Sequence, residues 1–358
     1  MTTKIIRDFA PSADNNRNGE GSFITLKNGD IMLAYSRYAG DGDDDGSTAD
    51  IYASISTDGG ETFGEPYPII THNDMNADNI MSAGFMRMAN GDIGMFFLAK
   101  SQVTNCLSYL IRSSDEGKTW GEPVLCSEES GYFVVNNDRP IRTKSGRILV
   151  PAALHGTICL PGSTMVDDIF PGELYIFASD DDGFTFYTLA KGITIPVSRG
   201  CTTGVQEPGL IELDDGKLWC YIRTDSGRQY ETFSDDNGES WDEPAPSAFS
   251  SAVSPLSTRR LRDGRIIALW NPVPVYNGRS DEVEGVWTGA RTPLAIAVST
   301  DDGMSFSEPT LLETDERSGY CYVAIHETAN GDVLLGYCAG SVEDGSTLNR
   351  LRVRKIKI

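Results

Sequence analysis

The sequence predicts an all-β fold: a six-bladed β-propeller of four-stranded antiparallel blades, in one domain that spans residues 1–358. Three observations support this prediction. An eight-residue box recurs five times, a hairpin signature recurs six times out of phase with the box, and the composition is rich in turn residues. Repeats this far apart are typical of one small sheet per copy, because solenoid repeats are shorter.

The box has the pattern Ser-x-Asp-x-Gly-x-(Thr/Ser)-aromatic, and successive copies start 55 to 66 residues apart. In such a turn the aspartate can accept backbone N–H bonds, the glycine supplies a positive φ, and the aromatic ring packs in the core. We therefore expect the boxes to stabilise loops and to carry no chemistry. The five copies are Ser56–Phe63, Ser113–Trp120, Ser179–Phe186, Ser234–Trp241 and Ser299–Phe306.

The second repeat is a turn followed by an apolar strand, such as IMLAY or VLLGY. The number of its copies predicts the number of blades. Each copy predicts a hairpin whose second strand is buried on both faces. Six turns and five boxes predict six blades, and the missing box falls where residues 351–358 would meet residues 4–9. We expect strands from both chain ends to close the ring there, which removes an exposed sheet edge. The six turns are Asn28–Asp30, Asn90–Asp92, Ser145–Arg147, Asp215–Lys217, Asp263–Arg265 and Asn330–Asp332.

The composition agrees with many short strands and turns: 39% of the residues are hydrophobic, and there are 37 glycines and 17 prolines. No apolar run approaches the roughly 20 residues of a membrane span, and the start MTTKIIRDFAPS lacks the apolar core of a signal peptide. We therefore expect no membrane partner. As written, the chain is expected to be cytoplasmic, or secreted with its signal already removed.

The net charge of −22 argues against nucleic acid or an anionic membrane as a partner, because both require a basic face. An anionic substrate would have to be held by a local cluster of arginines. Seven dispersed cysteines without a CxxC spacing and three separated histidines argue against a disulfide framework and a metal site. We expect no metal and no cofactor, and the sequence leaves the oligomeric state open.

The densest acidic stretch is Asp41–Gly46, with the sequence DGDDDG. It imitates the start of a calcium-binding loop, but Tyr52 stands where that loop needs a bidentate glutamate. Two interpretations remain: a solvated loop, or a loop that turns one carboxylate toward the centre of the ring.

Over essentially its whole length the chain resembles the sialidases, six-bladed propeller glycosidases that carry Asp boxes. Since non-enzymatic propellers share such boxes, the resemblance depends on the active-site pattern. Glu207 lies nine residues before a hairpin glycine and Arg223 seven after it, as in the family. Tyr322 lies nine residues before the last hairpin glycine, with Tyr320 close by, and Arg291 lies eight residues before the last box.

In the first blade the resemblance suggests Arg37 and Asp44 as further site residues. The family's opening Arg-Ile-Pro strand is absent, and the corresponding stretch reads GEGSF, with Glu20 near the position of the arginine. Arg17, three residues earlier, could reach the same space. The departure suggests a divergent member that acts on an eight- or nine-carbon 2-keto sugar acid.

The resemblance implies a retaining glycoside hydrolase that acts on an anionic carbohydrate. A neutral tyrosine, Tyr322, is the expected nucleophile, because a carboxylate would repel the carboxylate on the reacting carbon. Ionising a phenol at pH 7 costs about 4 kcal/mol, so a base must touch it, and Glu207 takes that role. Arg223 and Arg291, with Arg37 as a possible contact, would hold the substrate carboxylate. Asp44 would protonate the leaving oxygen, and Asp41, Asp43, Asp45 and Asp50 are alternatives for this role.

Two alternatives remain open. His155 directly follows an apolar strand and Arg139 precedes the same hairpin, so both could reach the centre of the ring. Together they would suit a polysaccharide lyase that neutralises the carboxylate of a uronate and uses a tyrosine as base. The missing first arginine would also suit a carbohydrate-binding propeller without catalysis.

Overall fold

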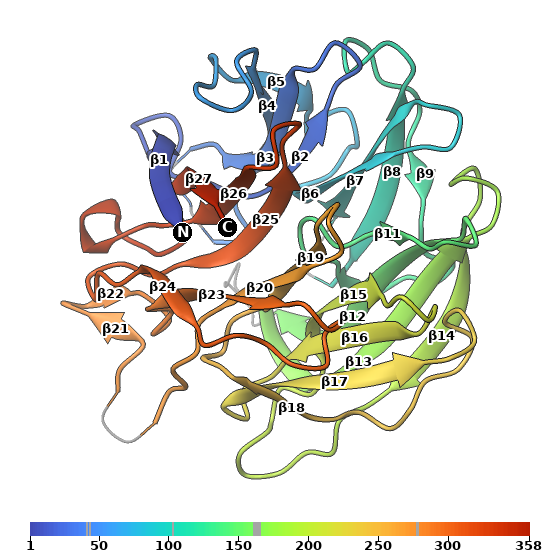
Figure 1. The fold of residues 1–358 in the computed structure, drawn as a ribbon, viewed down its shortest axis with the longest axis vertical. Coiled ribbons are helices and arrows are strands. Elements are labelled where there is room, and N and C mark those ends of the chain that lie inside the picture. The colour runs from blue at the N-terminus through green and yellow to red at the C-terminus, as the bar shows by residue number, and fades with distance from the viewer. Residues whose placement is uncertain (41, 43, 102–103, 160–165, 277–278) are drawn as a thin grey trace.

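The computed structural model describes residues 1–40, 42, 44–101, 104–159, 166–276 and 279–358, with the backbone alone within 157–159 and 166–170. Among these residues the regular structure is β, apart from one 3-10 turn, η1 (Val342–Asp344), and none forms a helix long and apolar enough to cross a membrane. In Figure 1 the sheets follow one another in chain order around the middle of the molecule.

Four sheets have four antiparallel strands each. The first contains β2 (Arg17–Thr25), β3 (Ile31–Tyr38), β4 (Ala49–Ser56) and β5 (Tyr67–Ile70). The next contains β15 (Gln206–Glu212), β16 (Leu218–Arg223), β17 (Arg228–Ser234) and β18 (Ala245–Ser250). It is followed by β19 (Ser257–Arg260), β20 (Ile266–Trp270), β23 (Leu294–Ser299) and β24 (Thr310–Glu313). The last contains β25 (Cys321–Glu327), β26 (Val333–Cys338), β27 (Leu351–Lys357) and β1 (Thr2–Phe9).

The remaining strands form one nine-stranded sheet and a small hairpin of β21 (Glu282–Val283) and β22 (Val286–Trp287). One half of the large sheet contains β6 (Asn79–Arg87), β7 (Ile93–Lys100), β8 (Cys106–Ser113) and β9 (Val124–Leu125). The other half contains β11 (Ile141–Arg142), β12 (Ile148–Cys159), β13 (Val166–Ser179) and β14 (Tyr187–Ile193). The halves are joined by β10 (Tyr132–Val134), which runs antiparallel to β12 and meets β8 in parallel.

The two ends of the chain lie in the same sheet. Strand β1 pairs with β27 from Thr2 opposite Lys357 to Phe9 opposite Leu351. The Arg352 guanidinium strengthens this pairing with two bonds of 2.9 Å to the Asp8 carboxylate. The ends therefore meet in the sheet that lacks a box, the position at which the sequence predicts their pairing.

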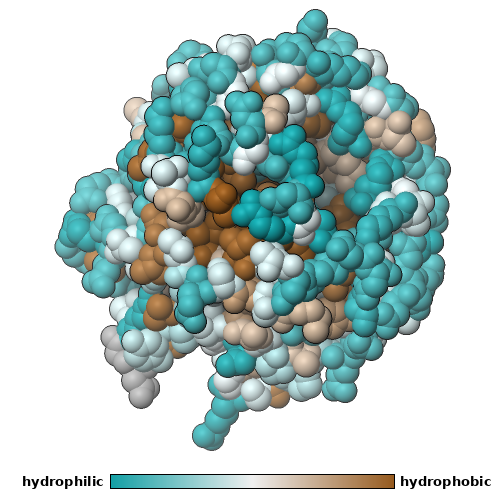
Figure 2. All heavy atoms as spheres, in the orientation of Figure 1, coloured by the Kyte–Doolittle hydropathy of each residue, from teal (hydrophilic) through white to brown (hydrophobic). Residues whose placement is uncertain are grey.

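The strand after each hairpin turn is buried, as the sequence predicts. All residues of β7, β20 and β26 are buried, and so are most of those in β3 and β16. Burying one large apolar side chain stabilises the fold by about 1.5–3 kcal/mol, so these strands contribute strongly to the core. Figure 2 shows hydrophobic residues around the middle of the face in view and hydrophilic residues along much of the rim.

The five boxes form one repeated turn. In every copy the serine hydroxyl donates to the box aspartate at 2.8 or 2.9 Å and accepts the glycine N–H at 2.7 to 2.9 Å. The glycines have φ between +83° and +92°. In the first copy, bonds from the Thr62 hydroxyl and N–H lower the pKa of Asp58 to about 2. Its aromatic residue Phe63 is buried, whereas the other four aromatic residues are half-buried against the core.

The fourth residue of a box ties its sheet to the preceding hairpin turn. Glu116 accepts the Lys27 N–H at 2.8 Å and pairs with Arg87 at the end of β6. Asp182 bonds Ala89 and Arg142 in the same way, and Asp302 bonds Asp214 and Arg260. These repeated contacts between neighbouring sheets show that the boxes serve the scaffold.

Candidate active site

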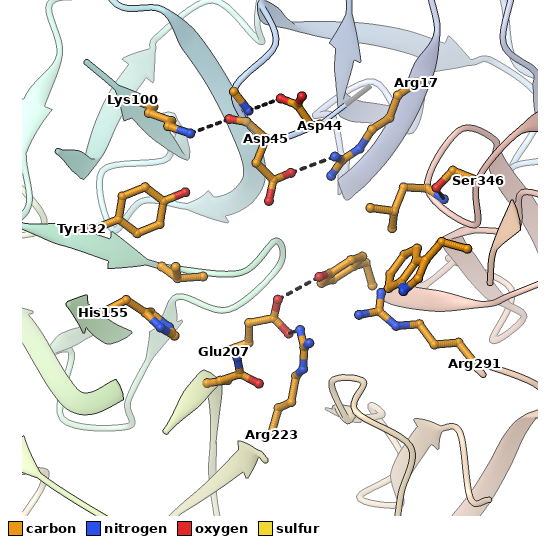
Figure 3. A pocket seen from close by; sticks show the side chains of 16 residues that line it. Arg17, Asp44, Asp45, Lys100, Tyr132, His155, Glu207, Arg223, Arg291 and Ser346 are labelled. Atoms are coloured by element: carbon orange, nitrogen blue, oxygen red, sulfur yellow. Dashed lines mark hydrogen bonds and ion pairs between the residues drawn. The ribbon is translucent and has the colours of Figure 1, made fainter. Parts of the chain in front are cut away.

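A pocket of about 590 Å³ lies where residues from five of the six sheets converge, together with Arg291 from the segment before β23 (Figure 3). The wall residues that carry charge or an aromatic ring are Arg17, Asp44, Asp45, Lys100, Tyr132, His155, Glu207, Arg223, Trp287, Arg291 and Tyr322. A second cavity of about 40 Å³ shares Asp45, Tyr132, Glu207 and Tyr322 with this pocket.

A bulge recurs in the first strand of three four-stranded sheets and in the first strand of the nine-stranded sheet's β6–β9 half. Glu20 in β2, Ser82 in β6, Glu207 in β15 and Tyr322 in β25 each lie at a break in the strand register. Their φ angles are +56°, +62°, +42° and +59°, in the left-handed region that non-glycine residues avoid. A bulge turns a side chain out of the alternation of its strand, and such strain costs about 1–3 kcal/mol per residue. All four side chains line the 40 Å³ cavity.

Two of these residues are in direct contact. The Tyr322 hydroxyl donates to Glu207 Oε1 at 2.8 Å, and Glu207 Oε2 accepts from Arg223 at 2.7 Å (Figure 3). Burial would raise the pKa of Glu207, but the charges of Arg223 and Arg291 outweigh it and lower that pKa. Burial and the Glu207 charge raise the pKa of Tyr322 well above its usual value. The pair is therefore a neutral phenol bonded to a carboxylate that can accept its proton.

Arg291 lies between β22 and β23 and is 2% exposed. Its guanidinium carbon lies 4.9 Å from the centre of the Trp287 ring and 5.3 Å from that of Tyr322. It donates to Cys321 Sγ at 3.0 Å, and among the described residues no carboxylate forms an ion pair with it. Burial raises the pKa of Cys321, but bonds from Cys338 and Arg291 lower it further than burial raises it. Sequence reasoning missed both Cys321 and Trp287, whose spacing carries no signal.

Arg17 lies beside Glu20, the residue near the position of the family's first arginine. It donates to Glu20 Oε1 at 2.6 Å and to Asp45 Oδ1 at 2.7 Å. Ser82 donates to the other Glu20 oxygen at 3.0 Å. Burial raises the pKa of Glu20 although the Arg17 charge lowers it. Arg17 therefore reaches the pocket from the side where the sequence lacks the expected arginine.

Within the acidic loop, the carboxylate of Asp45 faces the pocket and that of Asp44 does not (Figure 3). Asp44 Oδ1 accepts the Gly46 N–H at 2.7 Å and the Ser47 hydroxyl at 3.3 Å, which turns it back onto its own loop. For Asp45, desolvation would raise the pKa, but Arg17 and Lys100 lower it. Both residues line the pocket, but only the Asp45 carboxylate is turned toward its interior. Asp41 and Asp43 lie outside the described residues.

Three candidates line neither the pocket nor the 40 Å³ cavity. The Arg37 guanidinium stacks on the Tyr52 ring, 4.7 Å from its centre. Arg139 donates at 2.8 Å to both the Tyr221 hydroxyl and the Leu256 carbonyl, which hold it in the interior. Tyr320 is 2% exposed and packs in a hydrophobic cluster beside Tyr337. Tyr320 and Tyr322 differ because the bulge at Tyr322 breaks the alternation that would place both on one side.

The wall opposite Arg291 contains Lys100, Tyr132 and His155 (Figure 3). The sequence predicts only His155, which lies opposite Tyr132 in the β10–β12 pairing and is 7% exposed. Lys100 ends the apolar strand IGMFFLAK, and a lone charge after a buried strand is the signal that could have identified it. Within the described part of the chain, no cluster of three or more acidic, histidine or cysteine residues could hold a metal ion.

Comparisons with known proteins identify the family and the fold. The profile of the family of BNR repeat-like domains matches residues 29–335. An anhydrosialidase from Macrobdella decora is 26% identical over 266 residues, which cover 69% of this chain and 32% of that protein. The chain thus spans about a third of the length of this curated relative.

Solved structures resemble the fold over nearly the whole chain. A protein of unknown function from Dyadobacter fermentans has a TM-score of 0.73 and 17% identity, with 99% of both chains covered. The NanB sialidase from Streptococcus pneumoniae has a TM-score of 0.71 and 14% identity, with 99% of this chain and 70% of that chain covered. An intramolecular trans-sialidase from Ruminococcus gnavus has a TM-score of 0.68 and 16% identity, with 99% and 97% covered.

Proposed function

The chain belongs to the family of BNR repeat-like domains, and from this premise we propose that it is a sialidase-type glycoside hydrolase. It releases a terminal 2-keto sugar acid with retention of the anomeric configuration. The observation that carries the proposal is the 2.8 Å bond from Tyr322 to Glu207 in a pocket that also contains Arg223 and Arg291. A nucleophile in contact with its base, beside cations for the substrate carboxylate, is the arrangement that this reaction requires.

In the first step the Tyr322 oxygen attacks the anomeric carbon while its proton passes to Glu207. The bond to the leaving oxygen breaks, and that oxygen takes a proton from an acid on the other side of the sugar. The low pKa of Glu207 keeps it ionised and ready to accept the proton. In the second step water attacks the anomeric carbon and gives a proton to the acid that was ionised in the first step. The tyrosyl–sugar bond breaks, and Glu207 returns the proton to the Tyr322 oxygen. Two inversions give net retention.

We assign the acid to Asp45 rather than Asp44. Its carboxylate is 57% exposed to the pocket, whereas the Asp44 carboxylate bonds its own loop. In the free protein Arg17 holds Asp45 in its ionised form. When the substrate carboxylate draws the Arg17 guanidinium away, Asp45 loses its counter-ion and becomes easier to protonate.

Arg17 completes a clamp with Arg223 and Arg291. All three line the pocket, and guanidinium groups bind a carboxylate through paired hydrogen bonds. The clamp holds the carboxylate while positive charge develops on the anomeric carbon. Arg17 thereby supplies the cation that an Arg-Ile-Pro strand supplies in the family.

For the fold, we infer six blades in a closed ring. The inference rests on the four four-stranded sheets, the two halves of the nine-stranded sheet, and the pairing of β1 with β27. In this interpretation the bulged first strands surround the axis, and the pocket lies at one end of it.

The test is turnover of fluorogenic aryl glycosides of N-acetylneuraminic acid and of eight- and nine-carbon 2-keto sugar acids. Wild type should release the aryl group, and Tyr322→Phe and Glu207→Gln should not. Tyr67→Phe, on the half-exposed strand β5, is the matched control. Full activity in both site variants would overturn the mechanism. NMR of the product separates the classes: a free sugar acid indicates hydrolysis, an internal anhydride intramolecular transfer, and an unsaturated uronate a lyase.

A further inference from the structure

Two cations in the pocket lack a carboxylate partner. Arg291 is 2% exposed and Lys100 is 3% exposed, and within the described part of the chain neither forms an ion pair with Asp or Glu. The other two pocket cations differ, because Arg17 pairs with Glu20 and Asp45, and Arg223 pairs with Glu207. Figure 3 shows Lys100 and Arg291 on opposite sides of the pocket.

The surroundings of Lys100 leave most of its hydrogen-bonding capacity for a ligand. Its ammonium donates to the Asp45 main-chain carbonyl at 2.8 Å and lies 5.5 Å from the centre of the Tyr132 ring. An ammonium has three N–H donors, so two remain. The nearest acid, Asp45, directs its carboxylate to Arg17.

A buried ammonium without a counter-ion is costly, because it has left water and gained no opposite charge. The cost is recovered when a ligand supplies the charge. A carboxylate held by Arg291 and Arg223 on one wall cannot also neutralise Lys100 on the other wall. The pocket walls carry four Arg and Lys residues against three Asp and Glu residues, in a chain of net charge −22, so the local excess is cationic.

We propose that the pocket recognises a sugar acid with a second negatively charged oxygen group, which Lys100 binds. The group is a carboxylate, sulfate or phosphate on the part of the sugar that lies away from the reacting carbon. This orientation rests on the proposed function, in which the first carboxylate lies against Arg291. Tyr132 and His155, on the same wall, border the group and set the space it occupies.

The experiment compares two substrates that differ in one charge: the aryl glycoside of a nine-carbon 2-keto sugar acid, and a panel of the same glycoside sulfated at single hydroxyls. For wild type we expect kcat/KM to be at least about tenfold higher for one member of the panel than for the parent. Lys100→Met should remove that preference, and Lys100→Arg should retain part of it. Lys118→Met, at an exposed position of the second box, Ser113–Trp120, should keep the wild-type ratio.

Because the readout is a ratio between two substrates in one protein, a general loss of stability in Lys100→Met does not imitate the expected result. Equal kcat/KM for the parent and all sulfated members in wild type would overturn the proposal. An unchanged preference in Lys100→Met would also overturn it.

Calorimetric binding of the sulfated and unsulfated free sugar acids to Tyr322→Phe separates this proposal from the proposed function. Tighter binding of a sulfated acid that is lost in Tyr322→Phe/Lys100→Met supports the Lys100 subsite. If wild type shows this binding but turns over no glycoside, only the proposed hydrolase function is overturned. Turnover with no preference in rate or binding would overturn the subsite alone. Absence of both binding and turnover would overturn both.

Discussion

The two pairs of bulged residues that line the 40 Å³ cavity have the same backbone and opposite electrostatics. Glu207 and Tyr322 touch each other, and Arg223 and Arg291 lower the pKa of Glu207. Glu20 and Ser82 also touch each other, but burial raises the pKa of Glu20 despite its bond to Arg17. The bulge determines where a side chain lies, and the neighbouring charges determine what it can do. The first pair is suited to nucleophilic chemistry, whereas the second holds Arg17 in place.

The largest expected effect lies in the first pair. Tyr322→Phe should lower kcat/KM by about 10³-fold or more, and Glu207→Gln by about 10²–10⁴-fold, because each removes one half of the nucleophile and base. The contrast between the two pairs would be wrong if Glu20→Gln, in the second pair, lowered kcat/KM as much as Glu207→Gln does. Steady-state kinetics on the preferred aryl glycoside, with folding checked by circular dichroism, makes the measurement.

Arg17 in the second pair should give a smaller loss and a shift with pH. Arg17→Met should lower kcat/KM by about 10–100-fold, because one carboxylate contact is lost. Its removal also frees Asp45 from the charge that lowers its pKa, so the proton stays on Asp45 to higher pH. The basic limb of the pH profile of kcat/KM, which reports the free enzyme, should therefore move to higher pH. An unmoved limb would argue that Asp45 is not the acid, and Arg17→Lys, which keeps the charge, is the control.

The strain at the bulges can be measured at Ser82, which has no assigned chemistry. Ser82→Ala loses the bond to Glu20 and keeps the left-handed backbone, whereas Ser82→Gly loses the same bond and relieves the strain. We expect the glycine variant to be more stable than the alanine variant by about 1 kcal/mol in urea denaturation. Equal stabilities would mean that the bulge stores no strain.

The smallest effect on activity is expected outside the pocket, at the first box. Asp58→Ala should leave kcat/KM unchanged and lower the melting temperature, because the turn loses four hydrogen bonds to this carboxylate. The folded pKa of about 2 lies below the ordinary value of 3.8, so the carboxylate stabilises the fold above that ordinary value. The difference in melting temperature between wild type and variant should shrink as pH falls toward 2. A difference that persists unchanged at pH 2 would contradict this account.

Particular residues show how far sequence reasoning reaches into the site. Glu207, Arg223, Arg291 and Tyr322 converge because each has a set distance from a hairpin glycine or a box, and those turns control the register of its strand. Arg37 and Tyr320 lie away from the pocket, and the Asp44 carboxylate bonds its own loop at the pocket wall, for three local reasons. A loop can turn either of two adjacent carboxylates inward. The Arg37 guanidinium stacks on the ring of Tyr52. A bulge breaks the alternation between residues 320 and 322.

By itself the sequence determined the repeat: the turns, the buried strands that follow them, and the pairing of the two chain ends. These features depend on local backbone preferences and on the period of apolar residues, which are properties of short segments. Only the tertiary structure decided that Arg17 bonds Asp45, that Cys321 contacts Arg291, and that Lys100 faces the pocket with no carboxylate partner among the described residues. These contacts join residues far apart in the chain, and their charges and burial arise only when the sheets converge.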